Sequence, residues 1–246
     1  MTGVAYRGTH VSLALPRLAP GERATFAADA GDEAVLVLLV GEVEWCGERA
    51  SRTDVFDERA SAVYLAPGTS VDVHTRAGTE LALARTVGCR LVASAGTAPV
   101  AVRPDGVVVH RRGRAGWQRD VHDVVADSVP AQCLIVGETF NEPGAWSSFP
   151  PHKHDGADGE PALEEVYYFR FDRPSGFGFQ GLYEADGAER AVFLRHGTVV
   201  GIPRGYHPVA AAPGYRLYYL WALVGSPRQL AMHEDPAHRW LHDTRA

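Results

Sequence analysis

The stretch WSSFPPHKHDGADGEPALEEVYY, residues 146–168, contains the features that decide what this chain folds into. His152 and His154 are separated by one residue, and alternate side chains of an extended strand project to the same face. Both imidazoles can therefore bind one metal ion. Glu165 begins the apolar run at 166–169, so the stretch also offers a carboxylate. Glu164 lies on the opposite strand face, and we favour Glu165 because it directly precedes the VYY run, although strand register decides between them.

A second stretch, GTVVGIPRGYHPVA at residues 197–210, offers a third imidazole. Pro203 and Gly205 predict a tight turn, because proline fixes φ and glycine adopts conformations that other residues avoid. This turn lets His207 point inward from a neighbouring strand. Three imidazoles and one carboxylate form a ligand set suited to a divalent transition ion, with positions left for water or substrate. The predicted ligands are His152, His154, Glu165 and His207.

Composition favours a globular β-protein and argues against nucleic acid as a partner. The 246 residues are enough for one large or two small domains, and 26 glycines and 16 prolines favour short strands joined by turns. The net charge is −6, whereas a phosphate-binding face needs a basic excess. The one basic run, residues 110–114, is more typical of a solvated loop or a small-anion contact.

Cysteine usage and hydropathy predict a cytoplasmic protein. Cys46, Cys89 and Cys133 are odd in number and widely spaced, so we expect no disulfide framework and a reducing compartment. The N-terminal residues lack the pattern of a signal peptide, and the longest apolar run, 34–40, is too short to cross a bilayer. We therefore expect no membrane partner.

Strand signals follow one another along the chain. The run AVLVLLV at 34–40 is continuously apolar and precedes a break at Gly41, whereas SVDVHT at 70–75 alternates with period two. Short strands separated by turn signals predict an all-β antiparallel sandwich or barrel. Residues 117–125 favour a short strand or a helical turn, and Pro236 favours a short helix at 235–241.

We place a domain boundary near residue 110, giving an N-terminal domain at 1–110 and a C-terminal domain at 111–246. In the first of these, His74 has no histidine partner between residues 34 and 100. A hydrogen-bonded or partly exposed strand histidine explains it better than a ligand role. We therefore expect the N-terminal domain to have no metal site.

The predicted ligand pattern resembles the two cupin motifs, in which H-x-H is followed by Glu and later by G-x5-P-x-G and a His. The spacing differs from those motifs, because ten residues separate His154 from Glu165 and one separates Gly205 from His207. The segment DGADGEPAL is polar and rich in turn residues, so we interpret it as a loop inserted between strands.

A closer resemblance is densest over residues 131–241. The strings WSSFPPHKHD, LEEVYYFRF, GFGFQGLYE and IPRGYHPVAAAPGYRLYYLWAL resemble the 5-deoxy-glucuronate isomerases of myo-inositol catabolism, relatives of the uronate ketol-isomerases of pectin breakdown. The resemblance implies a bicupin, with two cupin domains of jelly-roll-like double-stranded β-helix and a metal in the second. It also implies conversion of 5-deoxy-D-glucuronate to 5-dehydro-2-deoxy-D-gluconate. Residues 142–145 depart from the family's Gly and Asn, which affects no proposed ligand.

This aldose–ketose isomerisation moves a proton between carbons next to a carbonyl. One divalent transition metal, zinc first with Mn, Fe, Co or Ni as alternatives, can polarise the carbonyl and the adjacent hydroxyl. Glu165 and Lys153 are the candidate catalytic residues, although Lys153 alternates away from the two histidines and a solvated lysine is the other interpretation. Arg204 is the first choice to bind the substrate carboxylate and Arg170 the second. The remaining substrate-binding candidates are Tyr167, Gln180, Tyr183 and Tyr206.

Two other functions fit the same ligand set. A cupin oxygenase would use iron and dioxygen, because ligands alone do not fix the metal or the reaction. A non-catalytic cupin would bind a uronate without turnover. The expected partner is a small sugar-acid substrate, and a homo-oligomer is left open.

Overall fold

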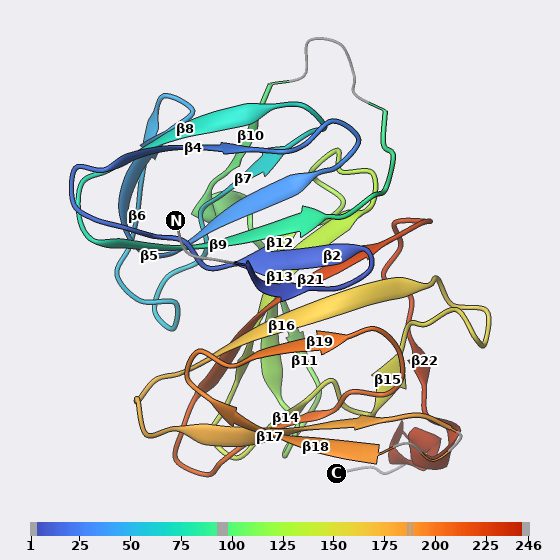
Figure 1. Ribbon diagram of the computed structural model, residues 1–246. Helices are drawn as coiled ribbons and strands as arrows, with labels where there is room; N and C mark the ends of the chain where they lie inside the picture. The colour runs from blue at the N-terminus through green and yellow to red at the C-terminus, as the bar shows by residue number, and fades with distance from the viewer. Residues whose placement is uncertain (1–3, 93–97, 186, 188, 243–246) are drawn as a thin grey trace. The chain divides into compact units, whose positions relative to one another are not determined.

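The computed structural model describes residues 4–92, 98–185, 187 and 189–242, and these form mainly β-strands. The chain divides into two compact units (Figure 1). Unit 1 contains the chain up to Val108 together with His122–Gly137 and Ala222–Val224, and unit 2 contains the remainder. The first division lies beside the boundary placed near residue 110, while two later segments return to unit 1. Two cupin domains at 1–110 and 111–246 stay a prediction.

The N-terminal strands are organised around the long strand β5. They pair in the order β1-β2-β9-β5-β7-β10, and β3, β4, β6 and β8 pair beside this path. In β8 the alternation predicted for SVDVHT sets the faces, because Val71 and Val73 are buried whereas Asp72 is exposed. The bounds are β1 (Val4–Arg7), β2 (Val11–Ala14), β3 (Arg17–Leu18), β4 (Arg23–Ala27), β5 (Ala34–Trp45), β6 (Glu48–Arg52), β7 (Ala62–Leu65), β8 (Ser70–Thr75), β9 (Thr79–Thr86) and β10 (Val100–Val102), followed by the 3-10 helix η1 (Pro104–Gly106).

Gly41 does not end the first apolar strand, so the break predicted there is wrong. β5 passes through Gly41, and its pairing with β9 shifts register between Leu38 and Val40. A Cβ on Gly41 would lie 2.7 Å from the Cα of Thr79. The glycine is therefore needed because two backbones approach closely, and not because the chain turns.

A buried carboxylate, that of Glu33, holds the start of the returning strand within unit 1. Glu33 is fully buried, and its oxygens accept hydrogen bonds from the backbone N–H groups of Gln132, Cys133 and Leu134. The Tyr64 hydroxyl donates a further bond at 2.7 Å. Charge can be buried where hydrogen bonds replace its hydration, so this carboxylate connects two parts of unit 1 that are far apart in sequence.

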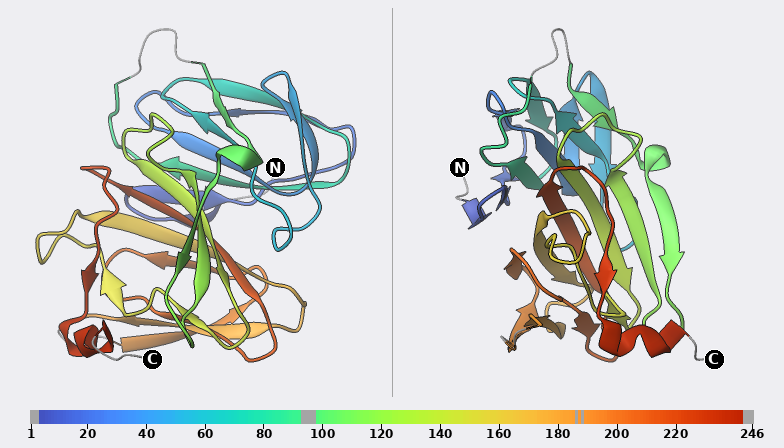
Figure 2. Two further views of the ribbon diagram at one scale, coloured as in Figure 1. Left: turned by 180° about the vertical axis from the view of Figure 1, so that it is seen from behind. Right: turned by 90° about the vertical axis from the view of Figure 1, so that its right-hand side faces the viewer.

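The later strands form two further sheets and one short pair, seen from two more directions in Figure 2. The six-stranded sheet has the order β11-β12-β13-β21-β16-β19, the four-stranded sheet has the order β14-β20-β17-β18, and β15 pairs with β22. The bounds are β11 (Val108–Arg112), β12 (Arg119–Val125), β13 (Leu134–Asn141), β14 (Trp146–Ser147), β15 (His152–Lys153), β16 (Leu163–Phe171), β17 (Phe177–Tyr183), β18 (Glu189–Arg195), β19 (Val199–Ile202), β20 (Val209–Ala211), β21 (Leu217–Gly225) and β22 (His233–Glu234).

The structure settles the secondary structure of two segments that the sequence left open or only predicted. Residues 117–125, predicted as a strand or a helical turn, contain strand β12. The short helix expected at 235–241 is the 3-10 helix η2 (Pro236–His242), which has Pro236 at its first position. Within the described ranges no helix is long and apolar enough to span a membrane.

Strand β16 positions the centre of unit 2. All nine of its residues are buried, and by alternation Glu165 shares a face with Tyr167, whereas Glu164 shares the other face with Arg170. β16 pairs antiparallel with β19, which places Glu165 opposite Ile202. The chain turns directly after Ile202, so the residues that follow the turn return beside Glu165.

Candidate metal centre

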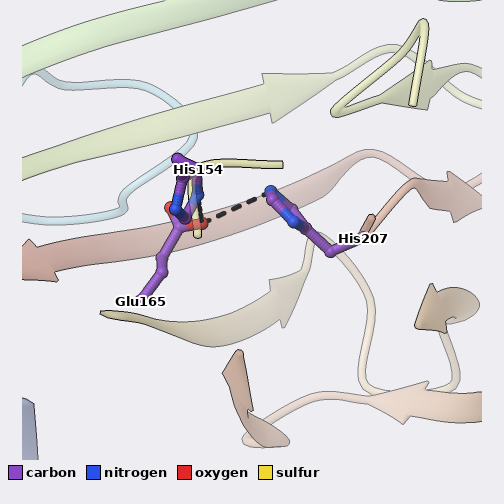
Figure 3. A group of neighbouring side chains, drawn as sticks. All are labelled: His154, Glu165 and His207. Carbon is purple, nitrogen blue, oxygen red and sulfur yellow. Dashed lines mark hydrogen bonds and ion pairs between the residues drawn. The ribbon is translucent and has the colours of Figure 1, made fainter. Parts of the chain in front are cut away.

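Three buried side chains converge on one point in unit 2 (Figure 3). The Nε2 atom of His154 lies 2.9 Å from Glu165 Oε2, and the Nε2 atom of His207 lies 3.4 Å from the same oxygen. The ring centroid of His152 lies 4.9 Å from that of His207. His154, Glu165 and His207 are at most 4% exposed, whereas His152 is partly exposed. The fold thus brings the ligand atoms of His154, Glu165 and His207 together, with the ring of His152 next to that of His207.

Backbone carbonyl groups orient all three imidazoles. A carbonyl oxygen only accepts hydrogen bonds, so the Nδ1 atom that faces it must carry the proton and donate. The Nε2 atoms of His152 and His207 are then left with a lone pair, which is the donor that a metal ion needs. The Nε2 atom of His154 instead faces Glu165 Oε2 at 2.9 Å, a contact that a bound metal ion would replace. The pairs of Nδ1 atom and carbonyl oxygen are His152 and Pro150 at 3.3 Å, His154 and Leu163 at 2.9 Å, and His207 and Gly205 at 3.0 Å.

Burial keeps two of the imidazoles neutral. It lowers the pKa of His152 and of His207 to about 3, because the imidazolium form would lose its hydration. Burial also opposes charge on His154, but the hydrogen bond and the Coulomb attraction from Glu165 outweigh it and raise the pKa of His154. Neutral imidazole is the form that ligates metal ions, so His152 and His207 are ready to do so.

One nitrogen atom of the cluster has no hydrogen-bond partner among the described residues. His207 Nε2 makes no hydrogen bond to any residue that the structure describes, although its side chain is fully buried. A buried polar atom without a partner costs about 1–3 kcal/mol, and such atoms mark sites where an ion or water belongs. Together with the convergent Nε2 atoms and the carboxylate, this atom fits a divalent transition metal.

Two predicted substrate-binding residues lie beside the cluster. The Tyr167 ring centroid is 5.9 Å from that of His207, and its hydroxyl lies 3.1 Å from Ser148 Oγ. Burial raises the pKa of Tyr167 well above its usual value, so the phenol stays neutral. Gln180 is fully buried on β17, and its Nε2 donates to the His207 carbonyl oxygen at 3.5 Å. Both residues contact the ligand His207 or its ring.

Tyr183 and Tyr206 form a separate stacked pair. Their ring centroids are 4.9 Å apart at an interplanar angle of 25°, and Tyr183 donates to Asp235 Oδ2 at 2.6 Å. Burial, followed by the bond to Asp235, raises the pKa of Tyr183. These contacts describe a packed pair, and within the described residues neither hydroxyl bonds to a predicted metal ligand.

Lys153 points away from the cluster, as alternation requires for a residue between two inward histidines. Its Nζ lies 2.6 Å from Asp155 Oδ1, 2.9 Å from Asp158 Oδ2 and 2.7 Å from Glu160 Oε1. The side chain is only 6% exposed, so the solvated lysine considered from the sequence does not occur. The ammonium instead ties together the loop at 155–160, which separates His154 from Glu165.

The two predicted carboxylate-binding arginines have other contacts. The Arg204 side chain is 61% exposed, and its Nη2 pairs with Glu184 Oε2 at 2.6 Å. Arg170 is buried on the face of β16 opposite to Glu165, where Nε donates to the Tyr168 hydroxyl at 3.1 Å. Neither guanidinium faces the metal cluster in these contacts.

Sequence reasoning missed one cation near the cluster. Arg119 opens β12, and its Nη1 donates to the carbonyl oxygen of Phe149, the residue before Pro150, whose own carbonyl oxygen faces His152 Nδ1. Tyr219 packs on Tyr167 with ring centroids 4.6 Å apart. Arg119 lies in a polar stretch without any motif, so only the pairing of distant strands could have revealed its position.

The β-fold of the chain is that of the cupin class. Solved oxalate decarboxylases share the fold. One from Bacillus subtilis, with Mn(II) centres, has a TM-score of 0.65 and 13% identity, covering 92% of this chain and 71% of that chain. One from Lactobacillus farciminis has a TM-score of 0.68 and 11% identity, covering 97% of this chain and 82% of that chain.

Within that class, the chain belongs to the KduI/IolB family, whose sequence model matches residues 1–241. An IolB-like protein from Salmonella typhimurium has a TM-score of 0.84 and 33% identity, covering 95% of this chain and 90% of that chain. The 5-deoxy-glucuronate isomerase of Geobacillus kaustophilus is 36% identical over 224 residues, which are 87% of this chain and 79% of the relative. That of Bacillus velezensis is 36% identical over 197 residues, 78% of this chain and 70% of the relative.

Proposed function

We propose that this chain is a metal-dependent aldose–ketose isomerase that converts 5-deoxy-D-glucuronate to 5-dehydro-2-deoxy-D-gluconate in myo-inositol catabolism. Relatives named 5-deoxy-glucuronate isomerase cover most of the chain and support the reaction. The observation that carries the proposal is the convergence of His154, Glu165 and His207 around one point, with His152 beside them.

The four residues would hold one divalent metal ion, with zinc proposed first and Mn, Fe, Co or Ni as alternatives. Such an ion supplies a Lewis acid for the carbonyl and hydroxyl oxygens of the sugar. Isomerisation removes a proton from C2 and returns one to C1, while the hydroxyl proton moves from O2 to O1. The chain must therefore provide a group that holds a proton in between, and Glu165 is the carboxylate at the cluster.

Neighbouring residues orient the sugar in this proposal. Tyr167 is neutral and can donate a hydrogen bond to a substrate oxygen, with Ser148 as its present partner. Gln180 supports the backbone of His207 and offers its amide oxygen, which has no hydrogen-bond partner among the described residues. Tyr183 and Tyr206 are assigned to support of the turn before His207, and Lys153 to support of the loop before Glu165.

Three broader features belong to the same proposal. The chain would be a bicupin, supported by two compact units and by the likeness to oxalate decarboxylases. It would act on a small sugar acid in the cytoplasm, the compartment that three widely spaced cysteines predict. Further copies of the chain are its proposed macromolecular partner.

Turnover without oxygen tests the reaction. We expect purified protein to convert 5-deoxy-D-glucuronate to the 2-ketose under nitrogen, as followed by NMR of the C1 and C2 signals. Exchange of one solvent deuteron into C1 would show that the proton passes through an exchangeable group. Product that forms only with dioxygen would identify an oxygenase, and binding without product would identify a non-catalytic cupin.

A further inference from the structure

We propose that Arg119 binds the carboxylate of the sugar acid through the Nε and Nη2 edge of its guanidinium. This inference rests on the proposed function and adds the residue that would read the acid group of the substrate. The metal cluster formed by the described residues contains no lysine or arginine, so a site that prefers a uronate to a neutral sugar needs such a cation beside it.

The guanidinium of Arg119 is held by its Nη1 atom alone. Nη1 donates to the carbonyl oxygens of Phe149 at 3.0 Å and Trp117 at 3.3 Å, which uses both of its protons. The rings of Phe149 and Trp117 pack with centroids 4.9 Å apart. A Cβ on Gly113 would lie 3.0 Å from Nη1 and 2.2 Å from the Trp117 Cδ1 atom, so little room remains for the group to move.

This anchoring leaves the opposite edge of the guanidinium for a ligand. No acceptor among the described residues bonds to Nε or Nη2, and no carboxylate there forms an ion pair with Arg119. Glu234 interacts with Arg119 only at longer range and accepts its short contact from His242. Two parallel N–H groups on one edge match the geometry of a carboxylate, which binds both.

The position of Arg119 fits a substrate that reaches the metal cluster. Arg119 and His152 are both partly exposed, whereas His154, Glu165 and His207 are buried. Arg119 bonds to the carbonyl oxygen of Phe149, and the carbonyl oxygen of the next residue, Pro150, faces His152 Nδ1. A sugar acid entering at His152 would therefore meet Arg119 at one end while its carbonyl end lies at the cluster.

The contacts of the other candidate arginines favour this assignment. Arg204 is largely exposed and forms an ion pair with Glu184. Arg170 lies on the face of β16 opposite to Glu165. Arg119 is the one of the three without a carboxylate or phenol hydrogen bond in the described part of the chain.

A pair of substrates that differ only in the acid group tests the proposal. 5-Deoxy-glucose has a hydroxymethyl group where 5-deoxy-glucuronate has its carboxylate, and both can undergo aldose–ketose isomerisation. For R119Q we expect kcat/KM on the acid to fall by about 30-fold or more, chiefly through KM, because loss of one partner of a hydrogen-bonded charge pair costs at least that much. The kcat/KM on 5-deoxy-glucose should stay within about threefold, since it has no carboxylate.

Two further variants make the result specific. Arg112 is exposed and near Arg119, so R112Q removes the same charge and should leave the preference for the acid intact. R119K keeps the positive charge but lacks the two parallel N–H donors of the guanidinium. We expect it to lose part of the preference for the acid substrate. If R119Q does not fold, as judged by its melting temperature and metal content, R119K alone decides the matter.

Three outcomes would overturn the assignment of Arg119. One is an equal fall on both substrates, which would mean that the arginine only supports the Phe149 backbone. Another is an unchanged preference in both Arg119 variants, and the third is a loss of preference in R204Q instead. Wild-type protein that isomerises neither substrate would contradict the proposed function itself, which is a distinguishable result.

Discussion

Glu165 is the residue on which the metal centre depends most, because one of its oxygens lies near the Nε2 atoms of both His154 and His207. Glutamine has the same shape but no charge. Loss of a group that only supports a metal ligand lowers metal affinity by about 10–100-fold. We expect Glu165→Gln, which changes a ligand itself, to lower metal affinity by at least that much and to abolish isomerisation. Equilibrium dialysis with zinc, followed by elemental analysis, measures the change.

The adjacent acid provides the matched control. Glu164 is buried on the other face of β16, so Glu164→Gln removes the same charge one residue away. Its metal content should equal that of the wild type, whatever its melting temperature. Loss of metal in E164Q with retention in E165Q would mean that Glu164, and not Glu165, is the metal ligand on β16.

At the residue scale, sequence spacing predicts the identity of the ligands but not what orients them. H-x-H spacing puts His152 and His154 on one face because strand alternation is strict, and Pro-x-Gly explains how His207 enters. The acceptors of their Nδ1 protons are backbone oxygens, which have no residue-type signature. Arg119 was missed for a related reason, because its neighbours lie on strands distant in sequence.

The turn between β19 and β20 is the element that places His207. Gly205 has φ of 84°, and a Cβ there would lie 2.6 Å from the Tyr183 carbonyl oxygen. Gly205→Ala should therefore push the turn away from β17 and lose metal as well as stability. Gly197 has φ of 89° but open space around it, so Gly197→Ala should cost only the backbone strain of about 1–2 kcal/mol.

Metal content and urea unfolding of the two glycine variants measure this difference. Retention of full metal occupancy by G205A would show that the turn adjusts without moving His207. Equal losses of stability in both variants would contradict the role of the close approach.

The loop between His154 and Glu165 is fixed by Lys153. Lys153→Met would leave Asp155, Asp158 and Glu160 without their shared cation, and breaking a buried ion pair costs about 3–5 kcal/mol. We expect the free energy of unfolding to fall by an amount in that range. Arg17→Met is the control, since the Arg17 pair with Glu80 is exposed and such pairs contribute about 0–1 kcal/mol.

Activity separates support from catalysis at Lys153. If Lys153 only fixes the loop, K153M protein that is folded and loaded with metal should keep kcat within about tenfold of the wild type. If the folded, metal-loaded variant shows no turnover, Lys153 has a catalytic role.

At the element scale, most strands and the polar loop could be predicted, because alternation and turn residues act locally. The loop read from DGADGEPAL is closed by the Asp155–Ala162 bridge, and Leu163 N donates to His154 O at 2.7 Å. The break at Gly41 was wrong because a glycine needed for close backbone approach looks the same in sequence as one that turns the chain.

The chain as a whole divides less simply than its linear order suggests. A boundary near residue 110 follows from local composition, but His122–Gly137 and Ala222–Val224 return to unit 1. Glu33 connects the first of these segments to the rest of unit 1, because it accepts hydrogen bonds from backbone groups about a hundred positions later. A buried acid of this kind cannot be distinguished from a surface acid by sequence alone.

Replacement of Glu33 tests how much that connection contributes. Glu33→Gln would turn one acceptor oxygen into a donor facing backbone N–H groups, and we expect it to lower the free energy of unfolding by about 2–3 kcal/mol. Tyr64→Phe removes one donor and keeps the carboxylate, so it should cost about 1 kcal/mol. Urea unfolding of both variants gives the values, and equal costs would contradict the role of the three backbone bonds.

Titration of chelator-treated, metal-free protein with zinc under nitrogen tests the whole assignment most directly. Isomerisation of 5-deoxy-D-glucuronate should be absent at the start, rise in proportion to added metal and stop rising at one equivalent per chain. Full isomerase activity in protein that elemental analysis shows to be free of metal would contradict a catalytic metal held by His152, His154, Glu165 and His207.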